Sequence, residues 1–97
     1  IITIPVFIFL NKGIYSLFPT LADNFVYIKL GNTIAGSFQI EIRDLAGKLV
    51  QKEVYNTNNI DPVTRVISIN TKKYLSGQYQ LTLFNHNNHY TEYFIKR

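Results

Sequence analysis

Short stretches in which apolar residues occupy every second position recur along most of this sequence, and they limit its fold more than any other feature. The clearest is SFQIEIRD (37–44), where Phe38, Ile40 and Ile42 alternate with polar side chains. Such alternation is typical of a strand with one buried face and one hydrated face. Similar stretches recur about every ten residues, turn residues separate them, and no longer window keeps a helical period. The pattern predicts an all-β fold, a sandwich or barrel of about six to seven strands.

Two of these stretches are expected to form a β-hairpin. Residues 48–55 run back along 37–44 after the short turn LAG, in which Gly47 supplies the positive φ that such turns commonly need. Val50 and Val54 fall on one face of the returning strand. The other expected strands are FVYIKL (25–30), TRVISIN (64–70), QYQLTLF (78–84) and YTEYFIK (90–96), with Ile67, Ile69, Tyr79, Leu81 and Leu83 facing the core.

The N-terminal segment is harder to assign. Its first ten residues, IITIPVFIFL, are apolar at all but one position but too few to span a bilayer as a helix, which needs about twenty residues. We therefore predict no transmembrane span, and consider a strand edged by Pro5, the apolar part of a secretory signal, or the end of a preceding domain. Residues 11–24 contain Gly, Pro, Ser and Asn and are interpreted as a connection. This divides the chain into an N-terminal segment, 1–16, and a sandwich, 17–97.

Composition excludes several classes of protein. The chain contains no cysteine, which rules out disulfides, thiolate metal ligands and cysteine nucleophiles. Its net charge of +4 would attract anions, but the Lys and Arg residues are mostly scattered singly. The longest basic runs are only Lys72-Lys73 and Lys96-Arg97, and no motif of a nucleic-acid-binding domain is present. We therefore expect no nucleic-acid partner.

No group of residues points to catalysis or to a bound metal. The two histidines form His86-Asn87-Asn88-His89 in a polar turn, which is a weak metal signal without further ligands nearby. The serines lie at turns and strand starts without a nucleophile elbow, and the acidic residues are dispersed along the chain. We expect neither enzymatic activity nor a cofactor.

The tyrosines leave one alternative open. Aromatic side chains can line a sugar-binding platform, because they combine apolar area with a polar tip. They can equally form cross-strand pairs within a sheet. Tyr55 and Tyr93 are the two residues on which we would test a sugar platform, and the full set is Tyr27, Tyr55, Tyr74, Tyr79, Tyr90 and Tyr93.

Three motifs follow one another toward the end of the sequence. The hairpin carries Asp-x-x-Gly-Lys-x-Val, an Ile-Ser-Ile strand leads to YLSGQYQLTLF (74–84), and the chain ends in Phe-Ile-Lys-Arg. Together with a Phe-Pro step at Phe18-Pro19, this order resembles the type A C-terminal sorting domain of the type IX secretion system. The similarity covers residues 17–97. The Phe-Pro step lacks the Asn and second Pro of that family's opening motif, and IITIPVFIFL has no counterpart in it.

The resemblance implies an immunoglobulin-like antiparallel β-sandwich of six to seven strands that acts as an address. A C-terminal signal of this kind takes a cargo protein through the outer-membrane translocon and is recognised by an outer-membrane β-barrel shuttle protein. A sortase-like peptidase often removes it, and we expect any cut within NKGIYSLFPT (11–20). The implied fate is export through the periplasm to the cell surface or medium. The implied docking residues are Phe18, Pro19, Asp44, Gly47, Lys48, Gly77, Lys96 and Arg97.

A different class of function is the alternative to this one. The same strand pattern is compatible with a small stand-alone sandwich in the periplasm or on the cell surface. Such a protein would bind carbohydrate or a protein partner and would not itself be a sorting signal.

Overall fold

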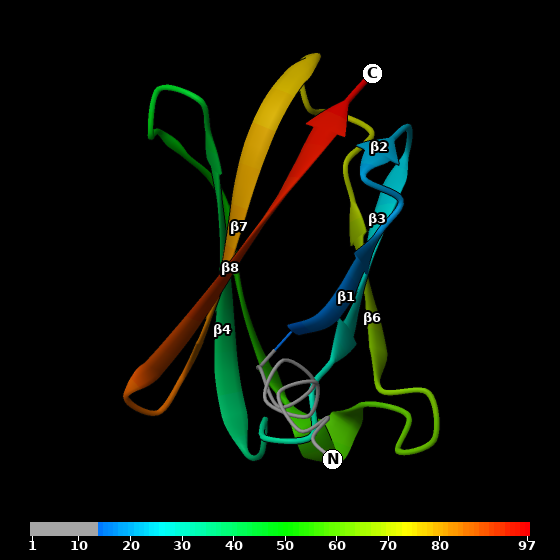
Figure 1. The fold of residues 1–97 in the computed structure, drawn as a ribbon, viewed down its shortest axis with the longest axis vertical. Helices are drawn as coiled ribbons and strands as arrows, with labels where there is room; N and C mark the ends of the chain where they lie inside the picture. The colour runs from blue at the N-terminus through cyan, green and yellow to red at the C-terminus, as the bar shows by residue number, and fades with distance from the viewer. Residues whose placement is uncertain (1–13) are drawn as a thin grey trace, which may run out of the picture.

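The computed structural model describes residues 14–97, which form two β-sheets packed face to face (Figure 1). The smaller sheet has the strand order β1-β3-β6 and the larger one β2-β8-β7-β4-β5. All pairs are antiparallel except the short parallel pair of β2 with β8. The strands are β1 (Ile14–Phe18), β2 (Leu21–Ala22), β3 (Phe25–Leu30), β4 (Ser37–Asp44), β5 (Leu49–Asn56), β6 (Val66–Asn70), β7 (Gly77–Asn85) and β8 (Asn88–Lys96).

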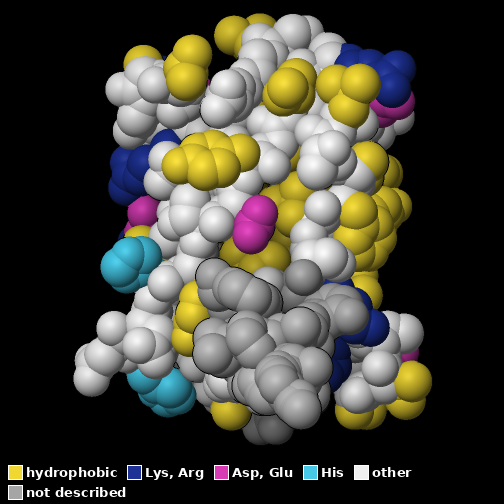
Figure 2. Space-filling view, viewed as in Figure 1, with side chains coloured by type: hydrophobic (Ala, Val, Ile, Leu, Met, Phe, Trp, Pro, Cys, Tyr) yellow, Lys and Arg dark blue, Asp and Glu magenta, His cyan; other side chains and the backbone are white. Residues whose placement is uncertain are grey.

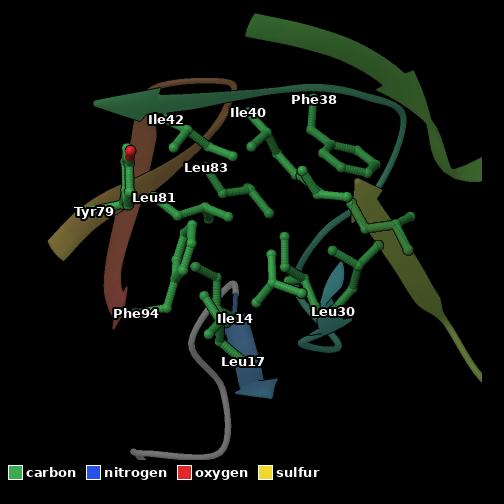
Figure 3. Close-up of a cluster of buried hydrophobic side chains, with 14 of the residues drawn as sticks. Ile14, Leu17, Leu30, Phe38, Ile40, Ile42, Tyr79, Leu81, Leu83 and Phe94 are labelled. Atoms are coloured by element: carbon green, nitrogen blue, oxygen red, sulfur yellow. The ribbon is translucent and has the colours of Figure 1, made fainter. Parts of the chain in front are cut away.

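The alternating apolar and polar residues of the sequence lie on opposite faces of the strands, with the apolar ones in the core. Phe38, Ile40 and Ile42 of β4 are 2% exposed or less and face the smaller sheet, while the residues between them line the outer face. Figure 3 shows how these side chains meet Leu81, Leu83 and Phe94 from the same sheet and Leu30 from the opposite one. Burying one such side chain contributes about 1.5–3 kcal/mol relative to exposing it. The predicted core positions Ile67, Ile69, Tyr79, Leu81 and Leu83 are all buried.

Two strands lie where we predicted only a connection. The interpretation of residues 11–24 is wrong for β1 and β2, which pair with β3 and β8. A register shift between Ile14 and Ser16 explains why β1 was missed. It lets Ile14 and Leu17 both reach the core although they are three residues apart, so the period of two is absent from the sequence. The interpretations of residues 1–10 lie outside the described part of the chain.

The strand β5 is exposed because it lies at the edge of the larger sheet. It pairs only with β4 and has no buried residue. Val54 is 68% exposed and Val50 is 39% exposed. Val54 pairs with Gln39 on the outer face, whereas its neighbour Tyr55 pairs with the core residue Phe38. The loop that follows β5 contains a single 3-10 turn, Thr57–Asn59.

Candidate functional site

The residues with an implied docking role come from four segments that meet at one end of the sandwich, the upper end in Figure 1. Asp44 at the end of β4 pairs with Tyr79 of β7. Gly77 at the start of β7 pairs with Lys96 at the end of β8. The Ile95 amide donates to the Thr20 carbonyl at 2.8 Å, which ties the connection after Phe18 and Pro19 to the same place. These contacts bring together segments that lie far apart in the sequence, the largest separation being the 79 positions between Phe18 and Arg97.

The turn between β4 and β5 is built by Asp44. Its Oδ1 accepts hydrogen bonds from the amides of Ala46, at 3.0 Å, and Lys48, at 2.9 Å. Its carbonyl accepts from the Gly47 amide at 2.9 Å, and Gly47 has a φ of 87°. The Asp-x-x-Gly-Lys spacing is therefore explained by turn geometry, because Asp caps the turn amides and Gly tolerates the left-handed region.

Gly47 gives a test of this explanation. A Cβ added at Gly47 would meet no atom within 4 Å, so any cost of Gly47→Ala must come from the backbone. We expect the free energy of unfolding, measured by urea denaturation, to fall by about 1–2 kcal/mol. Gly47→Asn should cost less, because Asn tolerates positive φ better. An alanine variant as stable as the parent would contradict this role.

The basic end of the chain is folded back onto the β2 segment. Lys96 is 8% exposed, and its Nζ donates to the carbonyl oxygen of Asp23. Arg97 Nε lies 3.4 Å from Asp23 Oδ1 in an exposed ion pair, and the Arg97 amide donates to the Ala22 carbonyl at 3.0 Å. We expected Lys96 to present its charge to a partner, but its burial does not fit that role. The two basic residues thus differ, and only the Arg97 side chain reaches the surface.

Two exposed leucines at this end were not predicted from the sequence. Leu45, in the β4–β5 turn, is 79% exposed, and Leu75, in the loop before β7, is 82% exposed. Both line a shallow groove that also contains Gly77. The available signal was an apolar residue inside each polar turn, LAG and YLSG. Figure 2 shows hydrophobic side chains exposed along this end of the molecule.

Comparison with known proteins places the chain in a family. The sequence model of the secretion system C-terminal sorting domain matches residues 16–97. The chain belongs to this sorting domain family. Membership supports the role of a C-terminal type IX sorting signal, and with it export, a surface or secreted fate and interaction with the secretion machinery.

The fold of the sorting domain is also found in a solved structure. A DUF3244 family protein from Bacteroides vulgatus with an immunoglobulin-like β-sandwich fold superimposes with a TM-score of 0.69 and 21% sequence identity. The match covers 90% of this chain and 86% of that one. The predicted immunoglobulin-like sandwich is confirmed by this similarity. No curated protein matches the sequence.

Tyr55 and Tyr93, the two tyrosines chosen to test a sugar platform, do not share one surface of the sorting domain. Tyr55 faces the core side of the larger sheet and stacks on Phe38, with ring centroids 5.4 Å apart. Tyr93 pairs with Gln80 on the outer face and is 55% exposed. The two rings therefore lie on opposite faces of one sheet and cannot contact the same sugar.

The histidines of the sorting domain lie in the β7–β8 hairpin, away from the end described above. His86 has a positive φ of 57°, and His89 lies beside Phe84 with ring centroids 6.1 Å apart. Within residues 14–97, no three His, Asp or Glu side chains are grouped as metal ligands would be. No helix in that range is long and apolar enough to cross a membrane.

Proposed function

We propose that this domain is the signal by which an outer-membrane β-barrel shuttle protein recognises a cargo protein in the periplasm and delivers it through the type IX translocon. In this proposal the domain has no catalytic role. The family match supports the first part of this proposal, that the domain is a C-terminal sorting signal. The shuttle as the recognising partner and the periplasmic route are the parts that we add.

One observation supports the site of recognition most directly. The three motifs that carry the family resemblance lie in different strands, yet Asp44, Gly77 and Arg97 come together at one end of the sandwich. The other end carries the β7–β8 turn and the loop before β6, and neither belongs to those motifs. A partner that contacted only the motif end would read all three motifs together.

Export of a fusion protein tests the proposal. The full chain is attached to the C-terminus of a periplasmic reporter in a host with a type IX secretion system. We expect the reporter outside the cell or on its surface, and the same fusion in a host that lacks the shuttle should stay in the periplasm. A matched control carries Leu81→Asp, which places a charge in the core and should block export by unfolding the domain. Retention of the parent fusion in the periplasm would overturn the proposal.

The same experiment locates any cleavage of the signal. Because β1 is paired with β3, a peptidase could cut within Ile14–Phe18 only after unpairing that strand. We therefore infer that the cut expected in residues 11–20 does not fall within β1. The cut, located by mass spectrometry of the released domain, should lie before Ile14 or after Phe18, and a cut within β1 would contradict this.

A further inference from the structure

A groove between two loops at the motif end has the character of a contact surface. We call it the loop groove. The β4–β5 hairpin contributes Lys48, Leu49 and Val50 to it, and the loop before β7 contributes Lys73, Tyr74 and Leu75. Its volume of about 310 Å³ lies at the low end of the range for small-molecule pockets, about 300–1,000 Å³. A groove of this size can accommodate a few side chains of a partner.

The walls of the loop groove expose more apolar surface than isolated surface leucines would. Leu75 is 82% exposed, while Leu49 and Val50 are 40% and 39% exposed. Leu45 extends this surface, because it lines the adjoining groove together with Leu75. Single exposed hydrophobic residues are common, but several around one concavity are typical of sites that bind another protein.

The floor of the loop groove is held in place by Tyr74 and Tyr79. The Tyr74 hydroxyl donates to Gln51 Oε1, and the Tyr79 hydroxyl donates to the Leu75 carbonyl at 2.6 Å. Their rings lie 5.0 Å apart between centroids. Burial raises the pKa of Tyr74 above its ordinary value, with smaller effects from Tyr79 and Glu53, so this phenol stays protonated at neutral pH and remains a donor. The groove is therefore formed before any partner arrives.

The loop groove has a net positive charge, because two lysines and one aspartate line it. Lys48 and Lys73 both line it. Among the described residues, neither Lys48 nor Lys73 takes part in an ion pair with a carboxylate. Asp44 lines the same groove and keeps its negative charge while its Oδ1 accepts hydrogen bonds from two turn amides, so the lining carries a net charge of +1. Lys72 adds a further positive charge next to Lys73.

We propose that the loop groove binds an acidic loop of a protein partner, whose apolar side chains pack against Leu75 and whose carboxylates face Lys48 and Lys73. The inference rests on the proposed function, in which that partner belongs to the export machinery. Charge complementarity of this kind sets association rate and specificity, and the apolar contacts add affinity. A concave groove favours a protein loop over a flat anionic membrane, which could touch only the rims.

Two variants of the reporter fusion test the groove separately from the sorting role. Lys48→Glu with Lys73→Glu reverses its charge. Leu45→Ser with Leu75→Ser removes the two most exposed large apolar side chains of the two grooves, Leu75 of the loop groove and Leu45 of the adjoining groove. We expect each double variant to lower the rate of export at least about tenfold, which corresponds to a loss of about 1.4 kcal/mol in the free energy of binding to the partner. The matched controls are Lys52→Glu and Val63→Ser, which change exposed residues outside the groove and should export normally. All variants should keep the parent melting temperature, because each residue is exposed.

The chemistry of the partner is tested by photocrosslinking. Benzoylphenylalanine placed at position 75 should crosslink to a protein segment containing Asp or Glu, whereas the same probe at position 63 should not. Changing those acidic residues to lysine should restore export of the doubly charge-reversed fusion.

The outcomes separate the two proposals. If the parent fusion stays in the periplasm, the sorting role itself fails. If the parent is exported and both groove variants are exported equally well, only the groove inference fails. A membrane is the other outcome. It would be indicated if the chain bound vesicles in which roughly one lipid in three is phosphatidylglycerol, if this binding depended on the two lysines, and if the probe at position 75 crosslinked to lipid. Crosslinks to a segment without acidic residues would overturn the charge argument.

Discussion

Replacing Leu81 with alanine is expected to lower the free energy of unfolding by about 2–5 kcal/mol. Leu81 is fully buried in the centre of β7, between the two sheets. The substitution removes apolar contact area and leaves a cavity that close-packed neighbours fill only in part. Urea denaturation measures the loss directly, and the melting temperature should fall by roughly 10 °C or more in a domain of this size.

Leu75→Ala is the matched control for that change. It removes the same atoms from a side chain that is 82% exposed, six residues before Leu81. Its effect on stability should stay within about 0.5 kcal/mol. Equal losses from both variants would mean that burial is not what distinguishes the two leucines.

Lys96→Glu is expected to destabilise the domain by about 3 kcal/mol. The change removes the charge-assisted hydrogen bond to the Asp23 carbonyl and places a carboxylate against that oxygen at a buried position. Thr71 Oγ1 also donates to this carbonyl, at 3.2 Å, so the oxygen itself keeps one partner. Thermal and urea unfolding at neutral pH would measure the difference from the parent.

Arg97→Glu provides the comparison at the neighbouring position. The side chains of Arg97 and Asp23 are 60% and 67% exposed, and ion pairs of such groups contribute about 0–1 kcal/mol because water screens them. We therefore expect a loss below about 1 kcal/mol. A larger loss from Arg97→Glu than from Lys96→Glu would reverse the roles that we assign to the two basic residues.

The burial of the chain end changes how truncations should be interpreted. Removing residues 90–97 would delete most of β8, including Phe94, which is 1% exposed and stacks on Tyr79 with ring centroids 5.5 Å apart. Loss of export in such a truncation would therefore report on folding as well as on recognition. The groove substitutions avoid this ambiguity, because they change exposed side chains only.

Much of the fold could be predicted because its signals are local. In a strand with one buried face, apolar residues recur at every second position whatever its neighbouring strands are. The turn from Asp44 to Gly47 depends on hydrogen bonds between residues a few positions apart. The six strands from β3 to β8 were accordingly predicted to within about two residues at their ends. The strand β1 was missed where a register shift removed the repeat, and β2 was missed because two residues are too few to show one.

The candidate site depended on contacts that no local pattern contains. The sequence determined the alternating strands, the turns between them and the order of motifs that resembles the sorting domain family. Only the tertiary structure decided that these motifs share one end, that Lys96 is buried against Asp23 while Arg97 is exposed, and that Tyr55 and Tyr93 lie on opposite faces. The physical reason is that strand pairing joins residues far apart in the chain. The fate of each side chain follows from which strand becomes its neighbour, and a single sequence does not encode that pairing in any short window.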